Sequence, residues 1–272
     1  MTTMLLAGVD FSSSPSRKKP ITVATGRLVD GCAVLRVDDL VELFTLDAFA
    51  GWLQTPGPWL GAYDFPFGLP RRFVDANALG ASAAEVIAEV HRRAPTRMAW
   101  RALIDAWGNT QPAGARLLHR RTDVASPVGS TSPLQTRYVP VGLMYYEGVA
   151  RLVASGVSMP GLHVGDDGRV ALEGYPRRSA HAIVARRSYK NGDDDDRREA
   201  REAIVAALEV GAGGALRLSI GDCTLRASLI ADASGDRLDA VLCLMQAAAA
   251  SRLVRYGLPR EIDPVEGWIV AA

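Results

Sequence analysis

Two aspartates each stand at the end of an apolar run that has the composition of a buried β-strand. Asp10 ends "LLAGVD", and Asp64 ends "WLGAYD". Asp236 and Asp239 lie three residues apart in the helix-like run "DRLDAVLCLMQAAAA", a spacing that places both on one helix face. Carboxylates that lie close together disfavour joint ionisation unless a cation lies between them. The pattern predicts a cation site formed by Asp10, Asp64 and Asp239.

The expected cation is Mg²⁺ or Mn²⁺, because both are hard ions that prefer carboxylate oxygens as ligands. Two such ions held about 4 Å apart stabilise the attacking and leaving oxygens during in-line displacement at a phosphodiester. We therefore expect metal-dependent phosphodiester hydrolysis, with Asp10, Asp64, Asp239 and Asp236 as catalytic residues. Three of these four acids also have a structural alternative: Asp10 and Asp64 suit turns, and Asp236 suits a helix N-cap.

Glu173 is a further catalytic candidate. It ends the strand-like run "RVALE", where its carboxylate could hold a metal or act as the base for an attacking water. The alternative is an ion pair with Arg177 or Arg178, which follow shortly along the chain.

The elements that must position these acids follow an α/β order. "MLLAGVDF", "ITVATGRLV" and "CAVLRVDDLVELF" are expected strands, and Asp30-Gly31 predicts a hairpin between the last two. A short helix capped by Thr45 leads to a fourth strand, "WLGAYDF", which favours a parallel crossover. In such sheets ligands bind beyond the carboxyl ends of the strands, where both Asp10 and Asp64 fall.

The rest of the chain is expected to extend the same α/β domain. Residues from about 71 to 165 are expected to form a largely helical insertion after the fourth strand, within a single domain of residues 1–272. A strand ending at Glu173 follows, then helices over 193–211, 224–233 and 236–257, and a closing strand or tail over 266–272.

The motifs "GVDFS", "AYDFPFGLP", "HRRTD", "LEGYPR", "DRLDAVLCLMQAA" and "EGWIV" resemble the family known as domain of unknown function 429. The resemblance extends from about residue 6 to about residue 270, and the family is described as inferred nucleases with a ribonuclease H-like fold. It implies a mixed five-stranded sheet flanked by helices, with the first three strands antiparallel. It also implies catalytic acids on the first strand, the fourth strand and the last helix, which here are Asp10, Asp64 and Asp239, with Asp236 one turn earlier as in Holliday-junction resolvases.

Two features depart from the nuclease pattern. The second acid in those nucleases is more often Glu, whereas Asp64 stands here, and Glu173 belongs to the family's own pattern without a clear nuclease counterpart. The motif "HRRTD" implies that Arg121 contacts a substrate phosphate and that Asp123 orients it.

The segment after the fourth strand is rich in arginine, which favours binding of phosphates. Besides Arg121 and Asp123, the candidate substrate-binding residues are Arg71, Arg177 and Lys190. Trp100 and Trp107 suit base stacking, but a place in the core is the favoured interpretation. The expected partner is nucleic acid or a small phosphodiester.

Composition narrows the class of protein. A net charge of +1 gives no overall attraction to nucleic acid or to a membrane. The three cysteines are expected to be reduced core thiols, and the four histidines form no zinc-binding pattern. With no signal peptide or membrane-spanning run, a cytoplasmic protein without membrane contact is expected.

Two other functions remain open. One is nucleotide binding or phosphotransfer of the actin-like ATPase type, although "DFSSSPSRKK" lacks the glycine-rich phosphate loop that this function requires. The other is a non-catalytic binding scaffold, because a fold does not by itself establish an activity.

Overall fold

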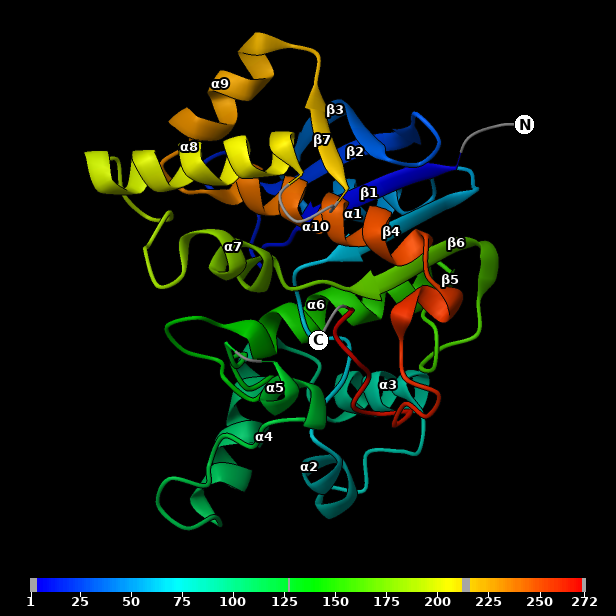
Figure 1. Cartoon of the computed structure of the whole chain (residues 1–272). Helices are drawn as coiled ribbons and strands as arrows, with labels where there is room; N and C mark the ends of the chain where they lie inside the picture. The colour runs from blue at the N-terminus through cyan, green and yellow to red at the C-terminus, as the bar shows by residue number, and fades with distance from the viewer. Residues whose placement is uncertain (1–3, 127, 212–215, 271–272) are drawn as a thin grey trace.

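The computed structural model describes residues 4–126, 128–211 and 216–270. These form a mixed sheet of seven strands in the order β5-β6-β4-β1-β2-β3-β7, with helices on both faces (Figure 1). The strands are β1 (Leu5–Asp10), β2 (Ile21–Val29), β3 (Val34–Leu43), β4 (Trp59–Tyr63), β5 (Val157–Ser158), β6 (Asp166–Glu173) and β7 (Arg217–Ile220).

The three N-terminal strands are antiparallel, and the hairpin at Asp30-Gly31 pairs Val29 with Val34. Both turn residues have positive φ, 53° and 63°, the conformation that Asp-Gly turns favour. β4 runs parallel to β1, and β6 runs parallel to β4. The carboxyl ends of β1, β4 and β6 therefore meet at one edge of the sheet.

The expectation of five strands is wrong, because β5 and β7 extend the sheet at its two edges. β5 has only two residues and lies inside the segment 71–165 that was expected to be largely helical. β7 has four residues, which pair with Val34–Val37 of β3. Strands this short carry too few alternating residues to be recognised from hydrophobic periodicity.

The helices divide between the two faces of the sheet. The core on one face contains residues of α7, α8, α9 and α10, and the core on the other contains residues of α1, α2, α3, α4 and α6 (Figure 1). The bounds are α1 (Leu46–Trp52), α2 (Arg71–Ala76), α3 (Ala83–Arg93), α4 (Arg97–Asn109), α5 (Arg121–Ala125), α6 (Val141–Ala154), α7 (Pro176–Val184), α8 (Asp195–Val210), α9 (Cys223–Ala231), α10 (Asp236–Ser251) and the short 3-10 turn η2 (Val254–Gly257).

Local signals account for several of these boundaries. The Thr45 side chain accepts a hydrogen bond from the Ala48 N–H and caps α1, as predicted. Asp194 caps α8 in the same way. The helix expected over 236–257 ends earlier, at Ser251, and Arg255 and Tyr256 have φ of 53° and 60°, which no α-helix accommodates.

The expectation of three core cysteines is correct only for Cys243, which is buried. Cys32 lies in the β2–β3 turn and Cys223 begins α9, and both are exposed because these positions lie at the surface. Trp100 and Trp107 are buried, as favoured above, and the Trp100 indole donates to the Gly142 carbonyl. Among the described residues, no helix combines the length and the apolar composition needed to cross a bilayer. Of the expected closing segment, residues 271 and 272 lie outside the described part.

Candidate metal centre

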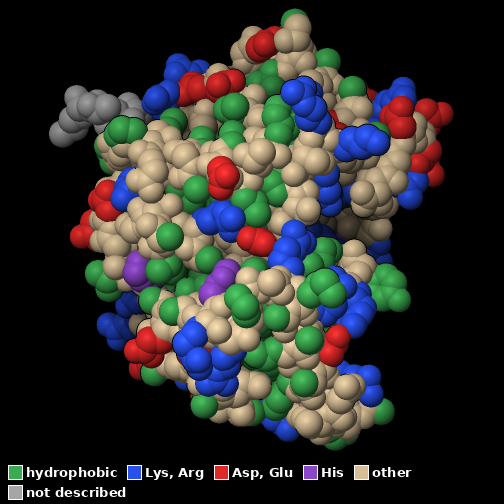
Figure 2. Space-filling model, turned by 180° about the vertical axis from the view of Figure 1, so that it is seen from behind, with side chains coloured by type: hydrophobic (Ala, Val, Ile, Leu, Met, Phe, Trp, Pro, Cys, Tyr) green, Lys and Arg blue, Asp and Glu red, His purple; other side chains and the backbone are tan. Residues whose placement is uncertain are grey.

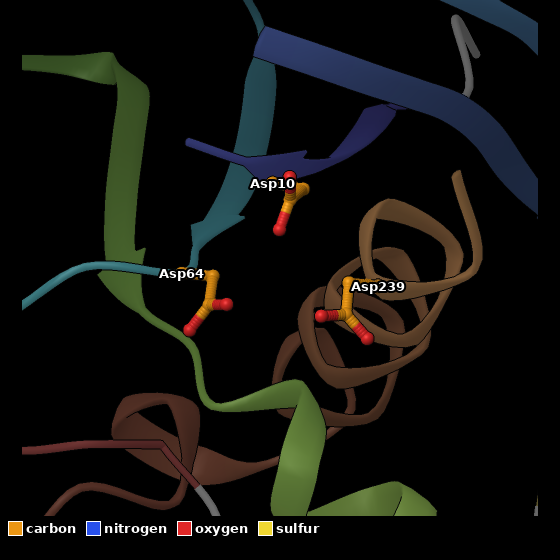
Figure 3. Close-up of side chains that lie close together, drawn as sticks. All are labelled: Asp10, Asp64 and Asp239. Atoms are coloured by element: carbon orange, nitrogen blue, oxygen red, sulfur yellow. The ribbon is translucent and has the colours of Figure 1, made fainter. Parts of the chain in front are cut away.

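Three aspartates from distant parts of the sequence converge at the carboxyl edge of the sheet. Asp10 is the last residue of β1, Asp64 directly follows β4, and Asp239 lies in the first turn of α10. One carboxylate oxygen from each lies within 4.8 Å of the other two, and the three side chains point toward one another (Figure 3). The structure therefore brings together the three residues that the sequence suggested as metal ligands.

Backbone contacts hold together the three elements that carry the aspartates: β1, β4 and α10. The Asp64 N–H donates to the Val9 carbonyl at 2.9 Å, which continues the pairing of β4 with β1 up to the two acids. The helix α10 lies directly on β1, because Gly8 of β1 has no side chain to separate the two backbones. A Cβ on Gly8 would lie 2.0 Å from the Leu244 nitrogen and 2.1 Å from the Ala240 oxygen.

The carboxylates occupy a strongly desolvated position. Asp10 and Asp239 are 6% and 1% exposed. Burial raises the pKa of Asp10 well above its ordinary value, Lys190 opposes this shift, and neighbouring carboxylates add to it. Burial, with a contribution from Asp239, raises the pKa of Asp64 to about 7. Ionising all three groups together therefore requires more positive charge than Lys190 alone supplies.

The donor set fits a hard divalent cation. Its three ligands are carboxylate oxygens, and among the described residues none donates a hydrogen bond to the side chain of Asp10 or Asp64. These two carboxylates therefore keep oxygens free to coordinate an ion.

Asp239 differs, because both of its oxygens already have protein partners. The Tyr189 hydroxyl donates to Oδ1 at 2.6 Å, and the Lys190 ammonium forms an ion pair with Oδ2. Burial alone would lower the pKa of Lys190, but the carboxylates of Asp239, Asp10 and Asp64 outweigh it and raise that pKa. Lys190, expected in a loop as a phosphate contact, thus lies within the acid cluster.

Asp236 lies beside the cluster but does not join its three-oxygen group. It is the first residue of α10, and the N-cap is Gly235, so the capping alternative for Asp236 is not observed. Burial raises the pKa of Asp236, while Lys190 and Lys19 oppose that shift.

Glu173 is engaged in a buried ion pair. The Arg120 guanidinium donates to its two oxygens at 2.6 and 2.8 Å, and the Phe67 N–H donates to Oε2 at 2.9 Å. The expected alternative partners, Arg177 and Arg178, are not the ones observed. Burial raises the pKa of Glu173, and Arg120 opposes that shift.

Arg120 is the residue that sequence reasoning missed. It is 2% exposed and also binds Asp123 through its Nε and Nη2 atoms, at 3.2 and 2.8 Å. Asp123, expected to orient a phosphate-binding arginine, is therefore buried and orients Arg120. The motif "HRRTD" contains the signal, because Arg120 directly precedes Arg121, the predicted phosphate contact.

The remaining substrate-binding candidates are dispersed. Arg71 forms a two-point ion pair with Asp263, at 2.6 and 3.0 Å. Arg121 and Arg177 are exposed. The Arg121 backbone N–H donates to Glu266. Of the five candidates, Lys190 contacts the acid cluster directly.

Comparison with family models, with curated proteins and with solved structures finds no match for this chain. The site therefore has to be interpreted from its own geometry.

Proposed function

We propose that this protein is a nuclease or phosphodiesterase that depends on Mg²⁺ or Mn²⁺ and has Asp10, Asp64 and Asp239 at its centre. The observation that carries the proposal is the approach of one oxygen from each aspartate to within 4.8 Å of the others. Three buried or half-buried acids rarely converge in this way without positive charge to neutralise them, and Lys190 supplies only one positive charge for the three carboxylates.

Membership of the family known as domain of unknown function 429, and its ribonuclease H-like fold, are part of the same proposal. Support comes from the five central strands, β6-β4-β1-β2-β3, of which β1 to β3 are antiparallel. Further support comes from the position of the three acids, on the first strand, after the fourth strand and on the last long helix.

The chain supplies ligands and positioning. When bound, the divalent ion would polarise a phosphoryl oxygen and neutralise developing negative charge. Asp10 and Asp64 have free oxygens with which to hold it. Asp239 holds Lys190 and Tyr189 beside it.

The net charge of +1 favours a small or structured substrate over long nonspecific nucleic acid. On the face shown in Figure 2, basic and acidic side chains are interspersed among hydrophobic ones. Electrostatic binding of long nucleic acid usually requires a continuous basic stripe. Exposed Arg121 is our candidate for a contact with a substrate phosphate.

The test is cleavage of labelled single-stranded, duplex and branched DNA and RNA with Mn²⁺. The wild type is compared with Asp10→Asn, and with Asp167→Asn at an exposed position as the matched control. We expect Asp10→Asn to lose activity by about 100-fold or more, because a full negative ligand charge is removed, and the control to remain active. Equal residual cleavage in all three proteins would indicate a contaminant. Absence of cleavage in all of them would favour a binding scaffold.

A further inference from the structure

Lys190 brings a positive charge into the acid cluster itself. Its ammonium forms an ion pair with Asp239, and the carboxylates of Asp10 and Asp64 are close enough to act on it electrostatically. A lysine in this position alters the charge that any bound metal has to compensate.

The loop that carries Lys190 is tightly anchored. Arg201 is fully buried and donates to the carbonyls of Tyr189 and Gly192, each at 3.0 Å. Arg197 donates to the carbonyl of Lys190 itself, at 3.1 Å. Arg201 also donates to the Ile230 carbonyl of α9 at 2.6 Å, so this buried arginine links the loop to a neighbouring helix. The position of Lys190 is therefore built into the fold.

Space for its side chain is also provided. Gly235 precedes α10 with φ of 79°, and a Cβ on this residue would lie 2.9 Å from Cγ of Lys190. A larger residue at the start of α10 would therefore press against the lysine stem on its way to Asp239.

We propose that Lys190 serves as a permanent cation of this centre, so that the site takes one divalent metal ion instead of two. The inference rests on the proposed function. Three carboxylates and one ammonium leave two negative charges, which a single divalent ion neutralises. Two divalent ions together with the ammonium would leave the site strongly positive.

The oxygen and nitrogen atoms available in the cluster also indicate a single metal ion. Both oxygens of Asp239 have protein partners, so Asp10 and Asp64 are the two of the three ligands whose oxygens accept no hydrogen bond from the described residues. The Lys190 ammonium has three N–H donors and, among the described residues, uses one on Asp239, so two remain for a phosphate oxygen. Lys190 would thus stabilise charge on the substrate in the place where a second metal ion would otherwise lie.

The test is the stoichiometry of Mn²⁺ binding to the metal-free full-length protein, measured by calorimetry and by equilibrium dialysis with metal analysis. Four proteins are compared: wild type, Lys190→Met, Lys190→Arg and Lys18→Met, the last at an exposed lysine. We expect one bound ion in the wild type, in Lys190→Arg and in Lys18→Met. Lys190→Met should bind the first ion about tenfold more tightly and gain a second, because the repulsion is removed and Asp239 is released.

Two bound ions in the wild type would overturn the inference and leave the proposed function intact. Identical binding by the wild type and a folded Lys190→Met, verified by circular dichroism, would also overturn it. If Lys190→Met does not fold, the stoichiometry of the wild type and of Lys190→Arg still decides whether the site takes one metal ion or two. Absence of Mn²⁺ binding in all four proteins would instead contradict the proposed metal-dependent function.

Discussion

Arg120 and Glu173 are joined by two hydrogen bonds in the interior of the protein, although 53 residues separate them in the sequence. The same carboxylate accepts the Phe67 N–H, from the segment that begins with Asp64. The pair therefore ties the strand end of β6 to the loop that leaves the metal centre.

Removing the Glu173 carboxylate should destabilise the protein. Glu173→Ala leaves Arg120 with one acidic partner in the interior, and breaking a buried pair in this way costs about 3–5 kcal/mol. Glu173→Gln retains an acceptor and should cost about 1–3 kcal/mol. Urea unfolding measures both, with Glu261→Gln at an exposed position as the control. A Glu173→Gln protein with wild-type stability and no cleavage would instead indicate a chemical role for Glu173.

Stability without metal should fall as the pH rises. The pKa of Asp64 is about 7 in the folded protein against 3.8 for the ordinary group, so the unfolded chain releases this proton at lower pH. The stabilisation is complete below about pH 4 and is lost as the pH rises through about 7. Melting temperatures measured in EDTA at about pH 5 and about pH 8 should show this fall, and Asp64→Asn should reduce it. An equal fall in Asp64→Asn and in the wild type would contradict the assignment.

Added metal should stabilise the folded protein. Millimolar Mg²⁺ or Mn²⁺ binds the assembled acids and not the unfolded chain, so it should raise the melting temperature of the wild type. Asp10→Asn should lose most of this shift, whereas Asp167→Asn should keep it. No shift in the wild type with either ion would count against the metal site.

Gly8 should not tolerate a side chain. Gly8→Ala forces apart the backbones of β1 and α10 and should cost about 3 kcal/mol or more. Gly51 is an exposed residue of α1 and has no atom within 4 Å of an added Cβ, so Gly51→Ala should stabilise the protein by about 0.5–1 kcal/mol. Chemical unfolding measures the free energy of unfolding of both variants. Equal changes in the two would mean that the contact between β1 and α10 is looser than described.

Arg121 and Arg71 should behave differently when replaced by alanine. Arg121 is exposed, so its loss should weaken substrate binding and lower the slope of log affinity against log salt by about 1. Arg71 is held by Asp263, so its loss should affect stability more than the salt slope. Fluorescence anisotropy at several salt concentrations separates the two cases, and a salt slope unchanged in Arg121→Ala would exclude a phosphate contact.

Much of the site could be predicted from the sequence, because its signals are local. An apolar run that ends in aspartate marks both a strand and the position of Asp10 or Asp64 at its end. Asp236 and Asp239 share a helix face through their spacing alone. The hairpin at Asp30-Gly31 and the cap at Thr45 depend on residues that are neighbours in the chain, and both are observed.

Tertiary structure alone decided which charges meet. Arg177 and Arg178 lie close to Glu173 in the sequence, yet its partner is Arg120, 53 residues earlier. Arg120 directly precedes α5, and the fold brings the start of this helix to the end of β6. Lys190 reaches Asp239 because two arginines of α8 fix its loop and Gly235 leaves room for its stem. The pairing of buried charges depends on how whole layers pack, since each charge takes whichever partner packing brings within hydrogen-bond distance in a desolvated interior. Residue types and spacing therefore determined the ligands, and the packing of α10 and the Lys190 loop on the sheet determined their counter-charge.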